Sequence, residues 1–248
     1  MTFIDATWIV LAGLAAGMIN TVVGSGSLIT FPTLIALGYP PVLANVSNNI
    51  GLVPGALSGV YGYRRELVGQ RARLMRLLPA SAAGGVIGAT LLLVLPSGVF
   101  TRVVVVLIVV ALLLVVFQPW LAQRFAAAHG HRTAISPVLV GLVGAAGIYG
   151  GYFGAAQGII LIALLAIFVA DDLQQLNATK NVLAMTVNLV ASGIFVFATN
   201  VDWKVVGCIA VGSVVGGQLG ATVGRRLDPR ALRVVIVVVG LTALFRLV

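Results

Sequence analysis

The sequence predicts an all-α integral membrane protein with about ten transmembrane or re-entrant helices in two inverted-topology repeats. Three observations lead to this prediction. Of the 248 residues, 60% are hydrophobic and only 8% are charged, compared with roughly 25% charged in an ordinary soluble domain. Apolar runs of helical length follow one another along the chain. The second half of the chain also repeats the first half at a constant spacing.

The apolar runs give the expected helices in order. A membrane-spanning helix needs about 20 apolar residues, with a range of roughly 17–25. Two runs are shorter, and each follows a glycine-rich break, at 24–26 in the first half and 150–154 in the second. Short, glycine-interrupted segments at matching places in two halves indicate a transporter binding site. The runs are 7–23, 27–38, 43–62, 74–95, 99–117, 134–151, 156–170, 176–198, 203–224 and 231–247.

The internal repeat appears when the sequence is shifted by 132 positions. Polar and glycine identities at one constant offset indicate a duplication, because chance alignment of apolar helices would not produce them. The glycines of the fourth and ninth runs are expected mainly to pack helices closely. The shift places Asn45, Ser47 and Asn49 on Asn177, Thr179 and Asn181, Gly26 on Gly158, and Ser81, Gly84, Gly85, Gly88, Ala89 and Thr90 on Ser213, Gly216, Gly217, Gly220, Ala221 and Thr222.

Basic residues predict how the repeats are oriented. The loop after the third run is rich in arginine, which predicts a cytoplasmic location, whereas its counterpart at 200–204 is nearly neutral. One helix later the bias reverses, and this opposite bias predicts inverted repeats with an odd number of crossings each. Five helices per half would satisfy this requirement, and so would three full spans plus a re-entrant hairpin. The arginines are Arg64, Arg65, Arg71, Arg73 and Arg76 in the first half and Arg225, Arg226, Arg230 and Arg233 in the second.

These patterns divide the chain into a first repeat (1–120), a cytoplasmic linker (121–133) and a second, inverted repeat (134–248). Both termini are expected on the periplasmic side of a bacterial inner membrane. The chain begins without the basic segment of a secretory signal, so the first run is expected to remain as a helix. The net charge of +9 would fit nucleic-acid binding in a soluble protein. Here the arginines cluster between apolar runs, so the expected partner is the lipid bilayer, and a homo-oligomer is left open.

The two glycine-rich breaks are candidate parts of a binding site. Within a membrane, non-helical backbone persists only where protein or a water-filled cavity surrounds it. The short helix after each break offers free backbone N–H groups and the positive end of its dipole, which can bind an anion without a charged side chain. Gly24, Ser25, Gly26 and Gly158 are therefore predicted to bind substrate. The alternative is that these glycines only allow close helix packing.

A second polar cluster opens the third run and recurs at the start of the eighth. One such residue would suffice to cap a helix, so four per half predict a site in which amide and hydroxyl groups donate to oxyanion oxygens. Lys180, which replaces Asn48 of the first half, is expected either to attract the anion or to extend toward the membrane surface. Other isolated polar residues are site candidates or ties between helices. The predicted ligands are Asn45, Ser47, Asn48, Asn49, Asn177, Thr179, Lys180 and Asn181, with Asn20, Tyr152 and Gln157, and with Tyr149 and Asn188 as further polar positions.

The positions of the acids and histidines exclude several function classes. Proton-coupled carriers and cation transporters usually hold a carboxylate within the membrane, whereas all six acids lie in predicted loops or at helix edges. An anion or a neutral solute is therefore the expected substrate. His129 and His131 lack partners for a metal site, and Ser25 has no helix-borne base, so no enzyme activity, metal or cofactor is expected. The acids are Asp5, Glu66, Asp171, Asp172, Asp202 and Asp228. The alternatives to a carrier are an anion channel, a membrane enzyme acting on a lipid-borne substrate, and a non-transporting scaffold.

With these motifs in hand, the chain resembles the TauE/SafE family of sulfite exporters and related anion permeases. The resemblance rests on residues 17–38, GMINTVVGSGSLITFPTLIALG, and on residues 147–163, GIYGGYFGAAQGIILIA, each followed by its asparagine-containing motif. It implies an inner-membrane permease for sulfite, a sulfonate or another small sulfur-containing or organic anion, working by alternating access. Ser27 stands where the family commonly has a further glycine, Gln157 interrupts the second glycine series, and Leu164 replaces the counterpart of Pro32.

Overall fold

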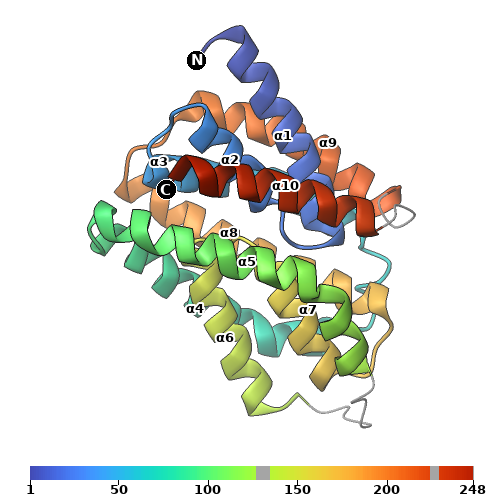
Figure 1. Ribbon diagram of the computed structural model, residues 1–248. Coiled ribbons are helices and arrows are strands. Elements are labelled where there is room, and N and C mark those ends of the chain that lie inside the picture. The colour runs from blue at the N-terminus through green and yellow to red at the C-terminus, as the bar shows by residue number, and fades with distance from the viewer. Residues whose placement is uncertain (127–134, 224–228, 248) are drawn as a thin grey trace.

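The computed structural model describes residues 1–126, 135–223 and 229–247, and it is helical throughout these ranges (Figure 1). Ten helices and no strands are found in them, which confirms the predicted all-α class. The predicted positions of His129, His131, Arg225, Arg226 and Asp228 lie outside the described residues. The helices are α1 Phe3–Val22, α2 Ser27–Ala36, α3 Pro41–Gly62, α4 Arg71–Val94, α5 Ser97–Ala126, α6 Pro137–Tyr152, α7 Gln157–Phe168, α8 Leu173–Ala198, α9 Trp203–Thr222 and α10 Pro229–Leu247.

Five of the described helices are long and apolar enough to cross a membrane, namely α1, α4, α5 over Gly98–Phe117, α8 and α9. Of the shorter apolar helices, α2 follows the first glycine-rich break, and α6 and α7 flank the second. The boundaries lie close to the predicted apolar runs, except at α5. This helix continues to Ala126, into the segment expected to be a linker. Apolar composition marks only the part of a helix that faces lipid, and backbone hydrogen bonding can extend the helix beyond it.

The two breaks have the same backbone form. Gly24 has φ +87° and Gly154 has φ +79°, a left-handed conformation that glycine adopts without steric cost. Each donates its N–H to the carbonyl five residues back, at 3.0 Å from Gly24 to Ile19 and 3.2 Å from Gly154 to Tyr149. Glycines in this conformation end many α-helices. The breaks are therefore defined C-terminal caps of α1 and α6, and each is followed within a few residues by a new helix.

Helix packing is exchanged between the two halves of the chain. α1 packs along α9, and its repeat counterpart α6 packs along α4. Gly13 faces Ile209 and Gly17 faces Ser213, so α1 and α9 run parallel. The first-half helix α3 also packs on α9, while the second-half helix α8 packs on α4. Helix α9 of the second half thus packs with α1 and α3 of the first half, and α4 of the first half packs with α6 and α8 of the second.

The middle of the molecule is formed by α3 and α8, which pack against each other in opposite directions. Asn49 near the start of α3 accepts a hydrogen bond from Ser192 near the end of α8, whereas Tyr63 just past α3 accepts one from Asn177 at the start of α8. The counterpart helices α3 and α8 are therefore antiparallel.

α5 and α10 contact each other and lie side by side across the front in Figure 1, where they cover α7 and α2.

Glycines allow the close approach of the packed helices. A Cβ at Gly84 would lie 2.2 Å from the carbonyl oxygen of Gly144, and one at Gly216 would lie 2.0 Å from that of Leu14. The same crowding holds at Gly88, where the Ile148 carbonyl oxygen would be 2.1 Å away. The prediction that these repeated glycines serve packing is confirmed.

Gly216→Ala should destabilise the protein by about 1–3 kcal/mol, because its methyl group would overlap backbone that cannot move aside. Gly207→Ala on the same helix is the matched control, since a Cβ there meets nothing within 4 Å. The control should be neutral or stabilising by about 0.5–1 kcal/mol, owing to the better helix propensity of alanine. Thermal unfolding of the purified variants in detergent measures both effects. Equal melting temperatures for the two variants would contradict the packing role.

Candidate functional site

The two predicted breaks meet inside the protein. The N–H of Gly158 donates a hydrogen bond of 3.0 Å to the carbonyl oxygen of Gly24. A Cβ at Gly158 would lie 2.4 Å from the Cα of Gly24, so the contact requires glycine at both positions. The first turn of α7 therefore uses this N–H for the partner half. The sequence had predicted that the N–H groups after both breaks would be free to bind a ligand, but the Gly158 N–H is already bonded.

The start of α2 does keep unused donors. Leu28 and Ile29 donate to the Ser25 and Gly26 carbonyls. The backbone N–H groups of Ser25, Gly26 and Ser27 make no hydrogen bond with any described residue. The Ser25 side chain is 1% exposed, and its Oγ also has no partner. A helix N-terminus with free N–H groups favours negative charge, so the first break retains the predicted anion-binding chemistry.

The carbonyl groups at the end of α1 are capped by the second-half motif. The Thr21 carbonyl oxygen accepts three hydrogen bonds, at 3.1 Å from Asn177 Nδ2, 3.3 Å from Lys180 Nζ and 3.2 Å from Asn181 Nδ2. Lys180 Nζ also donates to the Asn20 carbonyl oxygen at 3.2 Å. We call these five residues the α1-end cluster. Lys180 is 0% exposed, so the alternative that it extends to the membrane surface is wrong.

The end of α6 is capped in the same way by the first-half motif. Asn45 Nδ2 donates to the Tyr152 carbonyl oxygen at 3.1 Å, and we call this pair the α6-end cluster. Asn48, at the position that corresponds to Lys180, accepts instead from the Thr30 hydroxyl of its own half. Each asparagine-containing motif therefore stabilises the broken helix of the other half.

The capping bonds fix which side-chain atoms remain free. A backbone carbonyl can only accept, so Asn45 and Asn177 must direct their NH₂ groups to it. Their Oδ1 atoms are left buried and without a partner. A buried polar atom without a partner costs about 1–3 kcal/mol. Such atoms are typical of places where a protein binds a ligand, an ion or water. Six of the predicted site residues carry such an atom: Ser25, Asn45, Tyr152, Gln157, Asn177 and Thr179.

Not all predicted residues converge on one point. Asn45 lies in the second turn of α3, whereas Asn177 bonds to Tyr63 just past the end of that helix. These two positions on α3 are about 27 Å apart at 1.5 Å per residue. The α1-end and α6-end clusters therefore lie near opposite ends of α3, although Gly24 and Gly158 touch. The two polar motifs, both of which were expected to bind substrate, therefore do not form one compact site with the two breaks.

The remaining predicted residues have other contacts. Ser47 accepts from the Asp202 N–H at 3.3 Å, and Asn49 bonds to Asn188 and Ser192. The Tyr149 hydroxyl donates to the Ala155 carbonyl oxygen, so it ties the second break to α6. Sequence reasoning missed four residues that complete these networks, because each lies within or at the edge of an apolar run. They are Thr21, Thr30, Tyr63 and Ser192.

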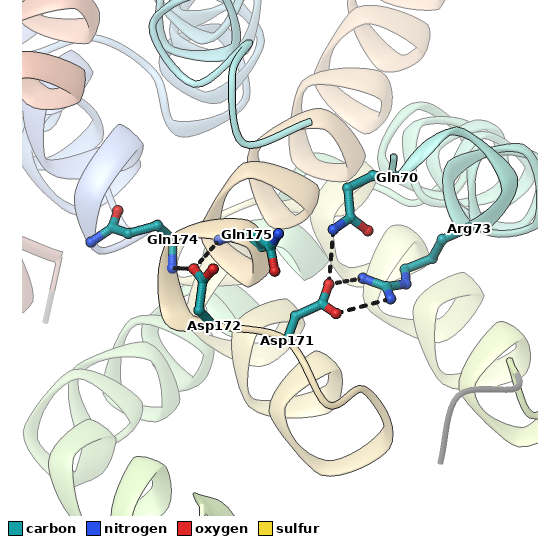
Figure 2. Close-up of polar contacts among 6 residues, drawn as sticks. All are labelled: Gln70, Arg73, Asp171, Asp172, Gln174 and Gln175. Carbon is teal, nitrogen blue, oxygen red and sulfur yellow. Dashed lines mark hydrogen bonds and ion pairs between the residues drawn. The ribbon is translucent and has the colours of Figure 1, made fainter. Parts of the chain in front are cut away.

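An ion pair joins the two halves near the start of α8. Figure 2 shows Asp171 bound by the Arg73 guanidinium through both carboxylate oxygens and by Gln70 Nε2 at 2.9 Å. Asp172 instead caps α8 by accepting from the N–H groups of Gln174 and Gln175. Partial burial opposes ionisation of Asp171, but the hydrogen bonds from Arg73 and Gln70 outweigh it and hold the pKa of this carboxyl below its usual value. The pair links the first turn of α4 to the α7–α8 loop.

Two helix breaks that meet among buried polar groups, within a bundle that contains several membrane-length helices, define a multi-pass membrane protein. Comparison with known proteins gives the family. The chain belongs to the sulfite exporter TauE/SafE family, whose model matches residues 9–247.

Relatives with similar sequences carry transporter names. A probable membrane transporter protein of Haemophilus influenzae is 27% identical over 229 residues, which cover 91% of this chain and 88% of the relative. The probable membrane transporter protein ORF9 of Sinorhizobium is 26% identical over 96% of this chain and 90% of its own length. The probable membrane transporter protein YfcA of Escherichia coli K12 is 23% identical over 90% of this chain and 82% of its own length. No solved structure shows a significant match.

The Asp171 ion pair should contribute stability that depends on pH. Because the folded-state pKa is depressed, the contribution is present above the unfolded value of about 3.9 and is lost as pH falls through the folded value. Asp171→Asn should lower stability at neutral pH by about 0.2–1 kcal/mol, the range for partly exposed pairs. The difference from wild type should vanish at acidic pH. Melting curves of both proteins at a series of pH values test this, and a constant difference down to strong acid would contradict it.

Proposed function

We propose that the protein is a permease for a small anion, such as sulfite, a sulfonate or a related organic or sulfur oxyanion, that works by alternating access. The observation that carries this proposal is the set of buried, unpartnered polar atoms around two capped helix breaks, next to a fully buried lysine. The description of the family as sulfite exporters agrees with an anionic substrate. Relatives named as probable membrane transporters agree with transport rather than catalysis.

Charge near the first break favours an anion over a cation. Ser25, Gly26 and Ser27 offer free N–H groups, and Lys180 lies beside the end of α1. Among the described residues, Lys180 is the charged side chain that is buried, and none of the described acids is. A cation would find no carboxylate there, whereas an anion would find backbone dipoles and one ammonium group.

The proposed architecture is a pair of inverted-topology repeats with five helices each. The exchanged packing of α1 on α9 and α6 on α4 supports it, as does the antiparallel pairing of α3 with α8. The arginine-rich segment before α4 would then be cytoplasmic in an inner membrane. Both termini would be periplasmic.

Alternating access requires one end of the pathway to close while the other opens. The Arg73–Asp171 ion pair joins the two halves at one end of α8. At the repeat-related positions stand Val205 and Tyr39, which cannot form an ion pair. A shallow surface hollow lined by Asn200, Asp202 and other residues lies at the opposite end of α8. This difference between the ends supports a state closed beside Arg73.

Lys180→Ala and Asn181→Ala should abolish transport while leaving the protein folded and inserted, because they remove donors at the first break. The assay measures uptake of radiolabelled sulfite, thiosulfate and short sulfonates into proteoliposomes, with and without Na⁺ or a pH gradient. Thr186→Ala is a control on the same helix, since this hydroxyl bonds only to the Val182 carbonyl of its own turn. The control should transport at the wild-type rate. Wild-type flux from both site variants would refute the site, and single-channel currents in a planar bilayer would identify a channel instead.

The inverted repeat predicts which residues share a side of the membrane. In a Cys208→Ser background, cysteines introduced at Arg71 and Arg226 should both be protected from a membrane-impermeant thiol reagent added to intact cells. A cysteine at the exposed Asn200 should react with the same reagent. Labelling of only one of the two arginine positions would exclude the inverted arrangement.

A further inference from the structure

We propose that Lys180 is a proton-binding site that couples anion transport to proton movement, an inference that rests on the proposed transport of anions. The site takes one proton together with one substrate anion and releases both on the other side of the membrane. The chain has no intramembrane carboxylate among its described residues to do this, so the task falls to the one buried titratable cation.

The contacts of Lys180 leave its charge without a counter-ion. Lys180 is 0% exposed, and its Nζ donates hydrogen bonds to the carbonyl oxygens of Asn20 and Thr21. These carbonyls form the negative end of the α1 dipole, which compensates a cation only in part. A buried ammonium with no acid partner is costly in a low-dielectric interior. The charged form is therefore stabilised when an anion arrives beside it.

The titratable groups around Lys180 cannot replace that anion. Besides Asp5 on α1, the described acids around α8 are Glu66 in the α3–α4 loop and Asp171 before α8, and Lys180 Nζ bonds to backbone carbonyls rather than to either carboxylate. Asp171 is already bound to Arg73. α7 has no titratable group, and α1 has only Asp5 at its far end. The other titratable groups on these elements are Tyr61 at the end of α3, Tyr63 just past it and bound by Asn177, Tyr149 and Tyr152 on α6, Arg64 and Arg65 in the α3–α4 loop, and Arg71, Arg73 and Arg76 at the start of α4.

The linkage between proton and anion follows from reciprocity. If an adjacent anion makes protonation of Lys180 more favourable, protonation makes anion binding tighter by the same factor. The free N–H groups of Ser25, Gly26 and Ser27 provide a place for the anion a few residues beyond Thr21. If part of the Lys180 population is unprotonated before the anion binds, anion binding causes that part to take up a proton from solvent.

Only one of the two repeats has a lysine at this position. Asn48 occupies the position of Lys180 in the first half, and it accepts a hydrogen bond from Thr30. The α6-end cluster therefore carries no titratable cation at that position. One proton, not two, is expected to accompany each anion.

Isothermal titration calorimetry of the purified protein with thiosulfate or methanesulfonate tests the proposal, because neither anion takes up a proton near neutral pH. Titrations in two buffers of different ionisation enthalpy count the protons absorbed on binding. Wild type should absorb a fraction of a proton per anion, and its affinity should fall several-fold as pH rises, because loss of the proton from the buried amine removes the charge that holds the anion. Lys180→Arg, which stays charged, should bind without absorbing a proton and without this pH dependence. Lys204→Met, which removes an exposed lysine, should absorb protons as wild type does.

The outcomes separate the two proposals. Anion binding by wild type without proton uptake overturns the coupling role and leaves anion transport standing. Equal proton uptake by wild type and Lys180→Arg assigns the proton to another group and also overturns it. Failure of every tested anion to bind or to be transported removes the proposed function itself. The wild-type measurement decides the matter even if a Lys180 variant does not fold.

Discussion

The structure depends on one constraint, which is that no backbone polar group can be left unsatisfied in the hydrocarbon of a membrane. Helices α1 and α6 both stop inside the protein, so their last carbonyl groups need donors. The donors come from the asparagine-containing motif of the opposite half, with Asn177, Lys180 and Asn181 at the end of α1 and Asn45 at the end of α6. The helix breaks therefore require the polar motifs, and the contact between the halves is what brings these donors to the exposed carbonyl groups.

Much of the fold could be predicted from the sequence, because its signals are local. Apolar length indicated the helices, and the constant offset between Asn45 and Asn177 indicated the duplication. The packing role of Gly84 and Gly216 followed from small residues at helical spacing. The end of α5 was missed, since lipid-facing composition stops before the helix does.

The candidate site was predicted less completely, because hydrogen-bond partners depend on tertiary contacts. The polar residues of the two motifs bind the helix ends of the other half, whereas their amide donors were expected to face the substrate. In the structure the Asn45 and Asn177 donors are used by backbone carbonyls, and their carbonyl oxygens remain free. The separation of the two clusters along α3 could not be inferred either, since it depends on the crossing of α3 and α8. Tyr63 and Thr21 left no signal in an apolar context.

Reciprocal capping has a consequence for how such a chain could arise and assemble. Because each motif completes the helix end of the other half, a half-length chain by itself would carry uncapped carbonyls within lipid. A single unit made by itself would therefore need a second copy to supply these donors. Because α1 is synthesised long before α8, the end of α1 stays uncapped until most of the chain has been made.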